Sequence, residues 1–256
     1  MPQCNVQCSL QTKQTIKYWA VFWVVLSAMH GVDLGRAASV PATLRFLRSQ
    51  KCPTTLNSRW RPASQSSNVA ALIPKASRPT SLNSSSADES QEWGPAHLKA
   101  MRDLSAGVHW ALAGSRGEYA AESGAAMRIA PLAFLLDPSK AGDRTIIRDV
   151  CRITQHNDQA YVGALAVVLS IRSVLAAIWS QQHSFLSAVV DSLPDSAVRD
   201  RIEELIQLQL SPSRVSSHFT ASGHVVAAVP LALHYAQYIA EEPLSVVLAA
   251  TYSCRR

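Results

Sequence analysis

The sequence predicts an all-α domain over residues 93–256, preceded by a largely disordered N-terminal region over residues 1–92. From Pro95 onward, apolar residues recur at three- and four-residue steps, which is the spacing of one helix face. No alternating strand pattern occurs in this part of the chain. The segment Ser49–Glu92 is rich in Ser, Pro, Asn and Ala instead. It is predicted to be a linker, because it cannot bury enough apolar surface to offset its chain entropy.

An apolar segment, Tyr18–Met29, lies within the N-terminal region. It is shorter than the roughly 20 residues that span a bilayer. Lys13 and Lys17 precede it, and a small-residue site follows at Arg36–Ala37–Ala38–Ser39, which is the outline of a signal peptide; the same composition also suits a buried strand. The sequence therefore predicts a cytoplasmic protein, or a secreted or membrane-anchored one if residues 13–39 act as a signal.

The charge distribution argues against nucleic-acid binding. Residues 1–92 carry ten Lys/Arg and four Asp/Glu, whereas residues 93–256 carry fourteen of each. The net charge of +6 therefore comes entirely from the N-terminal region, and the helical part shows no basic patch with interleaved aromatic residues. The five cysteines are scattered and form no C-x-x-C pair, which is typical of a reduced domain without a zinc or redox motif.

The first predicted helix follows Pro95 and is broken by Gly114 and Gly117. Its apolar face consists of Leu98, Met101, Leu104, Val108 and Leu112. A second helix is predicted after Asp143, which we expect to be its N-cap. Its apolar face consists of Ile146, Ile147, Val150 and Ile153.

The segment Ala160–Ser180 is apolar almost all round, which is typical of a helix packed by neighbours on every side. Arg172 and the many small residues argue against a membrane span. Gly163, Ala164 and Ala166 are expected to let neighbouring helices approach closely.

Three further helices are predicted, which brings the total to about six. Asp195–Leu208 has an aspartate at the cap position. Gly223–Ala240 is apolar on most of its surface, and Pro230 should kink it or mark its first turn. The last helix begins near Glu241, with acids and Pro243 in its first turn.

Three stretches resemble the ADP-ribosylglycohydrolase family, in order and in spacing. These are "GAAMRIAPLAFLLDP" (Gly124–Pro138), "ITQHNDQAYVGALAVVLSI" (Ile153–Ile171) and "SGHVVAAVPLALHYA" (Ser222–Ala236). The resemblance implies an orthogonal all-α bundle that binds ADP-ribose beside two magnesium ions and hydrolyses the glycosidic bond between ADP-ribose and an acceptor side chain. ADP-ribose or an ADP-ribosylated protein is the partner it implies.

The two carboxylate motifs that bind magnesium in that family are absent here. No TDDT-like run occurs before Trp93, and the chain reads "CRR" from Cys254, where a GGDTDT motif is expected. Hard divalent cations require clustered carboxylate oxygens. We therefore expect a truncated member of the family, without bound magnesium and inactive alone. Gln155 also stands where the family usually has a histidine, and His156 is expected to point about 100° away around a helix.

The resemblance implies four substrate-binding residues, namely Ser123, Gly124, Arg128 and His156. Each has a structural alternative. Gly124 could simply allow close helix packing, and Arg128 could bind the carbonyl groups at a helix end. Asn157 or Asp158 could be a helix cap rather than a ligand contact. His218 and His224 have no carboxylate beside them in the sequence, which favours two surface histidines over a metal site.

Two functions remain open from the sequence. One is an ADP-ribosylglycohydrolase-like hydrolase. The other is a non-catalytic remnant that binds ADP-ribose or a partner, or serves only as a helical scaffold. No catalytic residue is predicted in either case.

Overall fold

The computed structural model describes residues 94–176, 185–220, 222–238, 246 and 249. The predicted leader over residues 1–92 and nearly all of the helix predicted from Glu241 lie outside these residues. The described part is all-α apart from two short strands, so the predicted fold class is confirmed.

Eight α-helices occur in the described residues, together with two 3-10 helices, η4 and η5. In chain order the elements are α3 (Pro95–Ser105), β1 (Ser115–Arg116), η4 (Glu118–Ala120), α4 (Gly124–Arg128), η5 (Ala130–Phe134), α5 (Ala141–Arg152), β2 (Gln155–His156), α6 (Asp158–Leu175), α7 (Phe185–Val190), α8 (Ala197–Leu208), α9 (Pro212–Val215) and α10 (Val225–Gln237).

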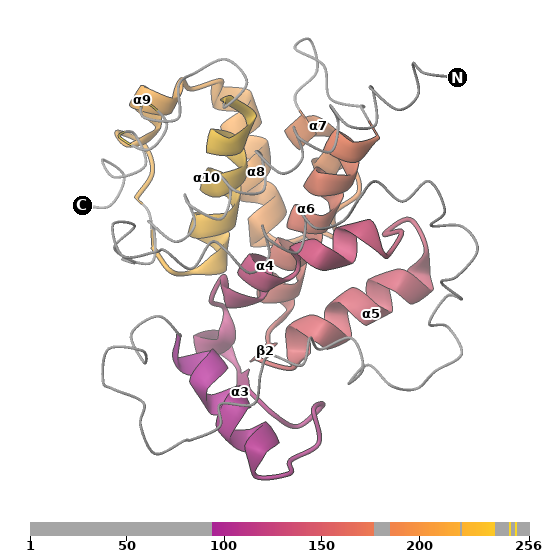
Figure 1. The fold of residues 1–256 in the computed structure, drawn as a ribbon. Helices are drawn as coiled ribbons and strands as arrows, with labels where there is room; N and C mark the ends of the chain where they lie inside the picture. Colours follow the sequence, from indigo (N-terminus) through magenta and orange to yellow (C-terminus); the bar gives the residue numbers. More distant parts are fainter. Residues whose placement is uncertain (1–93, 177–184, 221, 239–245, 247–248, 250–256) are drawn as a thin grey trace, which may run out of the picture.

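Helix α6 lies at the centre of the fold and packs against α4, η5, α5, α7, α8 and α10. Figure 1 shows α5 on one side of α6 and α8 and α10 on the other. Twelve of its 18 residues are buried, which confirms the predicted central helix. It is long and apolar enough to cross a membrane, but the burial of its side chains by other helices is what a core helix requires.

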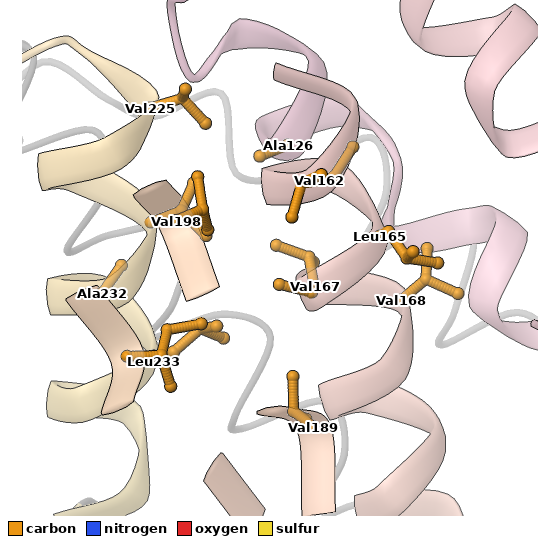
Figure 2. Close-up of a cluster of buried hydrophobic side chains, with 14 of the residues drawn as sticks. Ala126, Val162, Leu165, Val167, Val168, Val189, Val198, Val225, Ala232 and Leu233 are labelled. Carbon is orange, nitrogen blue, oxygen red and sulfur yellow. The ribbon is translucent and has the colours of Figure 1, made fainter. Parts of the chain in front are cut away.

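The core is a single cluster of mostly small and β-branched side chains around α6 (Figure 2). Val162 and Val167 of α6 face Val198 of α8 and Leu233 of α10 in this view, and Ala126 of α4 lies at the top of the same cluster. Small side chains allow the neighbouring helices to pack closely against α6.

Gly163 sets the spacing between α6 and α10. A Cβ atom at this position would lie 2.3 Å from Cγ2 of Val225, a distance that packed atoms do not reach. The predicted close approach at Gly163 is therefore confirmed, and Val225 at the start of α10 is the residue that uses it.

The helix ends agree only partly with the predicted caps. Asn157 caps α6 through Oδ1, which accepts hydrogen bonds from the backbone N–H of Gln159 (2.8 Å) and Ala160 (3.2 Å). Asp143 is not a cap. It lies inside the first turn of α5, where its carboxylate accepts from the backbone N–H of Asp137. Ser196, not Asp195, caps α8, because its hydroxyl is the group that meets the N–H of Arg199.

The first predicted helix is shorter than expected, and the prediction of its buried face was wrong. Helix α3 ends at Ser105, and Gly107 follows with a φ of 83° that favours glycine. Its buried residues are Ala96 and Ala100, whereas the side chain of Met101 is 44% exposed. Alanines four residues apart also share a helix face, so the apolar spacing did not distinguish the two faces.

Helix α10 contains Pro230 in its interior rather than in its first turn. The helix runs from Val225 to Gln237, and ten of its residues are buried. Its first residues face α6 and the loop before α4, which brings the third family-like stretch next to the first two.

Candidate functional site

Two short parallel strands bring distant parts of the chain together. In β1 and β2, Ser115 pairs with Gln155 and Arg116 with His156. Gly114 precedes β1 with a φ of 81°, and a Cβ atom there would lie 2.5 Å from the carbonyl oxygen of Thr154. No strand was predicted here, because two-residue strands are too short to show an alternating pattern.

The loop before α4 lies against the loop before α10. The N–H of Ser123 donates to the carbonyl of Gly223 (3.2 Å), and the N–H of Val225 donates to the carbonyl of Ala121 (2.8 Å). Ser123 is fully buried at the start of α4. These hydrogen bonds fix the first and third family-like stretches side by side at one end of α6.

Gly124 is enclosed by two side chains from other elements. A Cβ atom on Gly124 would lie 2.5 Å from Cε1 of His97 and 2.7 Å from Nε2 of Gln155. His97 belongs to the first turn of α3, and Gln155 belongs to β2. We call His97, Gly124, Arg128, Thr154 and Gln155 the Gly124 cluster.

Arg128, at the end of α4, reaches the C-terminal end of α5. Its Nη1 donates to the carbonyl of Val150 (3.0 Å), and its Nη2 donates to the carbonyl of Cys151 (3.1 Å) and to the hydroxyl of Thr154. A cation near the negative end of a helix dipole is stabilised, so this placement is favourable for α5. The structure shows the contact with helix-end carbonyls that was the alternative to ligand binding.

The hydroxyl of Thr154 continues the network by donating to Oε1 of Gln155. The side chain of Gln155 is fully buried, and its other polar atom, Nε2, has no hydrogen-bond partner. A buried donor without a partner costs about 1–3 kcal/mol. Such an atom in a folded protein requires an explanation.

Burial shifts the pKa values of two side chains at this end of α5. It lowers the pKa of the Arg128 guanidinium, which nevertheless stays charged at neutral pH. Burial also raises the pKa of the Cys151 thiol to about 12, against the opposing effect of Arg128. Cys151 is therefore a protonated packing residue and not a nucleophile.

His156 lies away from the Gly124 cluster. Its Nε2 donates to the carbonyl of Ala113 at 2.8 Å, and burial lowers the pKa of its imidazole. The expected 100° rotation relative to Gln155 was wrong, because both residues lie on a strand, where successive side chains point to opposite faces.

Three of the four predicted substrate-binding residues thus lie together, and His156 does not join them. Ser123, Gly124 and Arg128 occupy one short stretch at α4, beside the second family-like stretch at Thr154 and Gln155. Sequence reasoning missed His97 and Thr154. The only sequence signal was the position of Thr154 next to Gln155 within a family-like stretch.

The described residues do not fit the magnesium pair that the resemblance implies. Within residues 94–176, 185–220 and 222–238, no group of three or more His, Cys, Asp or Glu side chains is placed to hold a metal ion. His218 and His224 are both exposed, and Nδ1 of His224 accepts from the N–H of Val226 at the start of α10.

A family model described as ADP-ribosylglycohydrolase matches residues 23–253. The match includes all three family-like stretches and begins at residue 23, within the region predicted as a leader. Neither a curated protein nor a solved structure matches the chain.

Proposed function

Because the chain belongs to the ADP-ribosylglycohydrolase family, we propose that it binds ADP-ribose, free or attached to a protein, at the Gly124 cluster. The observation that carries this proposal is the meeting of the three family-like stretches. One residue set at each stretch lies at the same end of α6, although the stretches are far apart in the sequence. These are Ser123 and Gly124, Thr154 and Gln155, and Gly223.

The chemistry of the cluster suits a ligand rich in acceptor oxygens. ADP-ribose presents two phosphates and two riboses, and each of them accepts hydrogen bonds. The Gly124 cluster offers an unpartnered amide donor and a charged guanidinium behind it. Glycine at position 124 also lets the Gln155 amide lie directly against the backbone at the start of α4, where a side chain would overlap this donor.

Hydrolysis of the glycosidic bond is the chemistry of the family. In that reaction, bound magnesium would supply charge stabilisation and an activated water molecule. No described set of side chains fits the metal, and the sequence contains neither carboxylate motif, so we assign no hydrolytic step to the residues of this chain. We propose that the chain alone binds ADP-ribose without cleaving an ADP-ribosylated protein.

Isothermal titration of ADP-ribose into the full chain tests the binding. We expect saturable one-to-one binding that is lost in Gly124→Val, because the added side chain would overlap the His97 ring and the Gln155 amide. Gly142→Val is the control, because no atom lies within 4 Å of a Cβ atom at that position. Absence of saturable heat from the wild-type chain would leave only the scaffold interpretation.

A second assay separates binding from hydrolysis. An ADP-ribosylated protein is incubated with the full chain in MgCl₂ or in EDTA, and released ADP-ribose is measured. We expect no release in either buffer and no saturable heat when MgCl₂ alone is titrated into the chain. Magnesium-dependent release would contradict the proposed inactivity and indicate metal ligands that the described residues do not include.

A further inference from the structure

Three buried side-chain donors of the described residues have no hydrogen-bond partner, namely Nε of Arg128, Nε of Arg148 and Nε2 of Gln155, and the last of these faces Gly124. The Gln155 side chain has no exposed surface, its oxygen is held by Thr154, and its Nε2 has no partner. Buried polar atoms in native proteins nearly always find a partner. An unpartnered donor at the centre of a predicted ligand site is therefore the feature to be explained.

The hydrogen-bond network determines which end of the carboxamide faces the site. Arginine can only donate, so the Arg128–Thr154 hydrogen bond uses a lone pair of the Thr154 oxygen. The hydroxyl proton of Thr154 then needs an acceptor, and the oxygen of Gln155 is the acceptor in reach. With Oε1 held in this way, Nε2 must face Gly124 and His97.

We propose that Arg128 and Thr154 are positioning residues, which fix the Gln155 carboxamide so that its Nε2 donates a hydrogen bond to an oxygen of bound ADP-ribose. This inference rests on the proposed function and adds the residues that prepare the site. Arg128 is anchored independently by the carbonyls of Val150 and Cys151, so the network starts from the rigid end of α5.

Because Nε2 of Gln155 is buried, a ligand cannot reach it in this arrangement of side chains. An acceptor oxygen reaches this atom only after a neighbouring group moves. The ring of His97 lies at the same side of Gly124 and is half-buried, so we expect it to be the neighbouring group that moves when a ligand binds. The unmet hydrogen bond in the free protein is then made in the complex.

Substitutions at Thr154 test the positioning role in the full chain. Thr154→Val keeps the shape of the side chain but removes the hydroxyl, which releases the carboxamide. We expect ADP-ribose binding to weaken about three- to tenfold, the equivalent of one hydrogen bond. Thr154→Ser restores a hydroxyl and should restore the affinity. Thr145→Val is the matched control, because it removes an exposed hydroxyl that bonds only within its own helix, to Ala141.

A spectroscopic readout follows Gln155 directly in the wild-type chain. The side-chain amide signals of Gln155 are assigned by their loss in Gln155→Met, and ADP-ribose is then titrated. We expect these signals to shift on binding, and in Thr154→Val we expect a changed starting position.

The possible results separate the two proposals. Binding that leaves the Gln155 signals in place, or that is equally strong in Thr154→Val, overturns the positioning role and leaves the proposed function intact. Thr154→Ser binding as weakly as Thr154→Val also overturns it. A wild-type chain that binds no ADP-ribose overturns the proposed function itself and this inference with it.

Discussion

At Gly124, the missing side chain is as important as the side chains around it. The His97 ring and the Gln155 amide fill the space that a Cβ atom would occupy. The amide cannot easily move aside, because Thr154 and Arg128 hold it from behind. The glycine is thus required by local packing, whether or not a ligand is bound.

Gly124→Ala should destabilise the protein by about 1–3 kcal/mol, which is the usual cost of forcing an extra carbon into a packed site. Gly142→Ala, in the first turn of α5, has nothing within 4 Å of the new carbon and should be neutral or stabilising by up to about 1 kcal/mol. The free energy of unfolding from urea titrations measures both. Equal stability of the two variants would show that the Gly124 cluster has room to adjust.

The described glycine with the least room for a Cβ atom is Gly163, which lies on α6 where it meets α10. Val225 fits against Gly163 because no side chain stands between them. The same residue begins α10, and its N–H bonds to Ala121 in the loop before α4. The spacing of two core helices therefore also determines where that loop lies.

A double-mutant cycle tests this contact. Gly163→Ala should cost about 1–3 kcal/mol through overpacking, and Val225→Ala should cost about as much through lost burial. The double variant should be more stable than the sum of the two costs predicts, because the smaller residue 225 makes room for the new methyl group. Strictly additive free energies of unfolding would contradict direct contact between these positions.

A buried histidine connects α10 to Leu210, two residues before α9. Nε2 of His234 donates to the carbonyl of Leu210 (3.0 Å), and Nδ1 of His234 accepts from Gln237 (3.3 Å). The hydroxyl of Tyr238 donates to the same carbonyl. Burial lowers the pKa of His234 to about 4, against a smaller opposing effect of the Leu210 hydrogen bond. The neutral ring is therefore the form that the fold accommodates.

His234 should make the stability depend on pH. Because its pKa is lowered in the folded state, the unfolded chain binds the extra proton first as the pH falls. Neutral His234 contributes about 3 kcal/mol to the free energy of unfolding above about pH 6.5. This contribution is lost as the pH falls towards 4. Urea unfolding at pH 4 to 7.5 measures it.

The variant His234→Gln keeps a donor for Leu210 but does not titrate, so it should lose this part of the pH dependence. His218→Gln, at an exposed position, is the control and should follow the wild type. Parallel pH profiles of the wild type and His234→Gln would contradict the assignment.

For the molecule as a whole, the sequence predicted the helices better than the site. The apolar spacing located α5, α6, α8 and α10, because long helices repeat their pattern over several turns. It missed β1 and β2, which are two residues each, and with them the true orientation of Gln155 and His156. The binding of Arg128 to helix-end carbonyls was one of its two expected roles, but the helix that it reaches lies 22 to 26 residues away in the chain, which no local pattern contains.

The three family-like stretches come together only in the folded chain. Helix α6 provides the central support, α4 and α10 pack on it, and the loops before both helices pair at one end. The Gly124 cluster lies at this junction, and α8 and α9 contribute no residue to it. The first turn of α8 lies near this end of α6, because the N–H of Val198 donates to Oε1 of Gln159. Ligand binding should therefore affect this end and leave α9 and the last turn of α8 unchanged.

The most direct test is a ¹H–¹⁵N spectrum of the full chain titrated with ADP-ribose. We predict saturable shifts at the backbone amides of Ser123, Gly124 and Gly223 and at the Gln155 side chain, with little change in α9 and in the last turn of α8. An absence of shifts at millimolar ADP-ribose, or saturable shifts confined to α9 and the last turn of α8, would contradict the assignment of the Gly124 cluster as the ADP-ribose site.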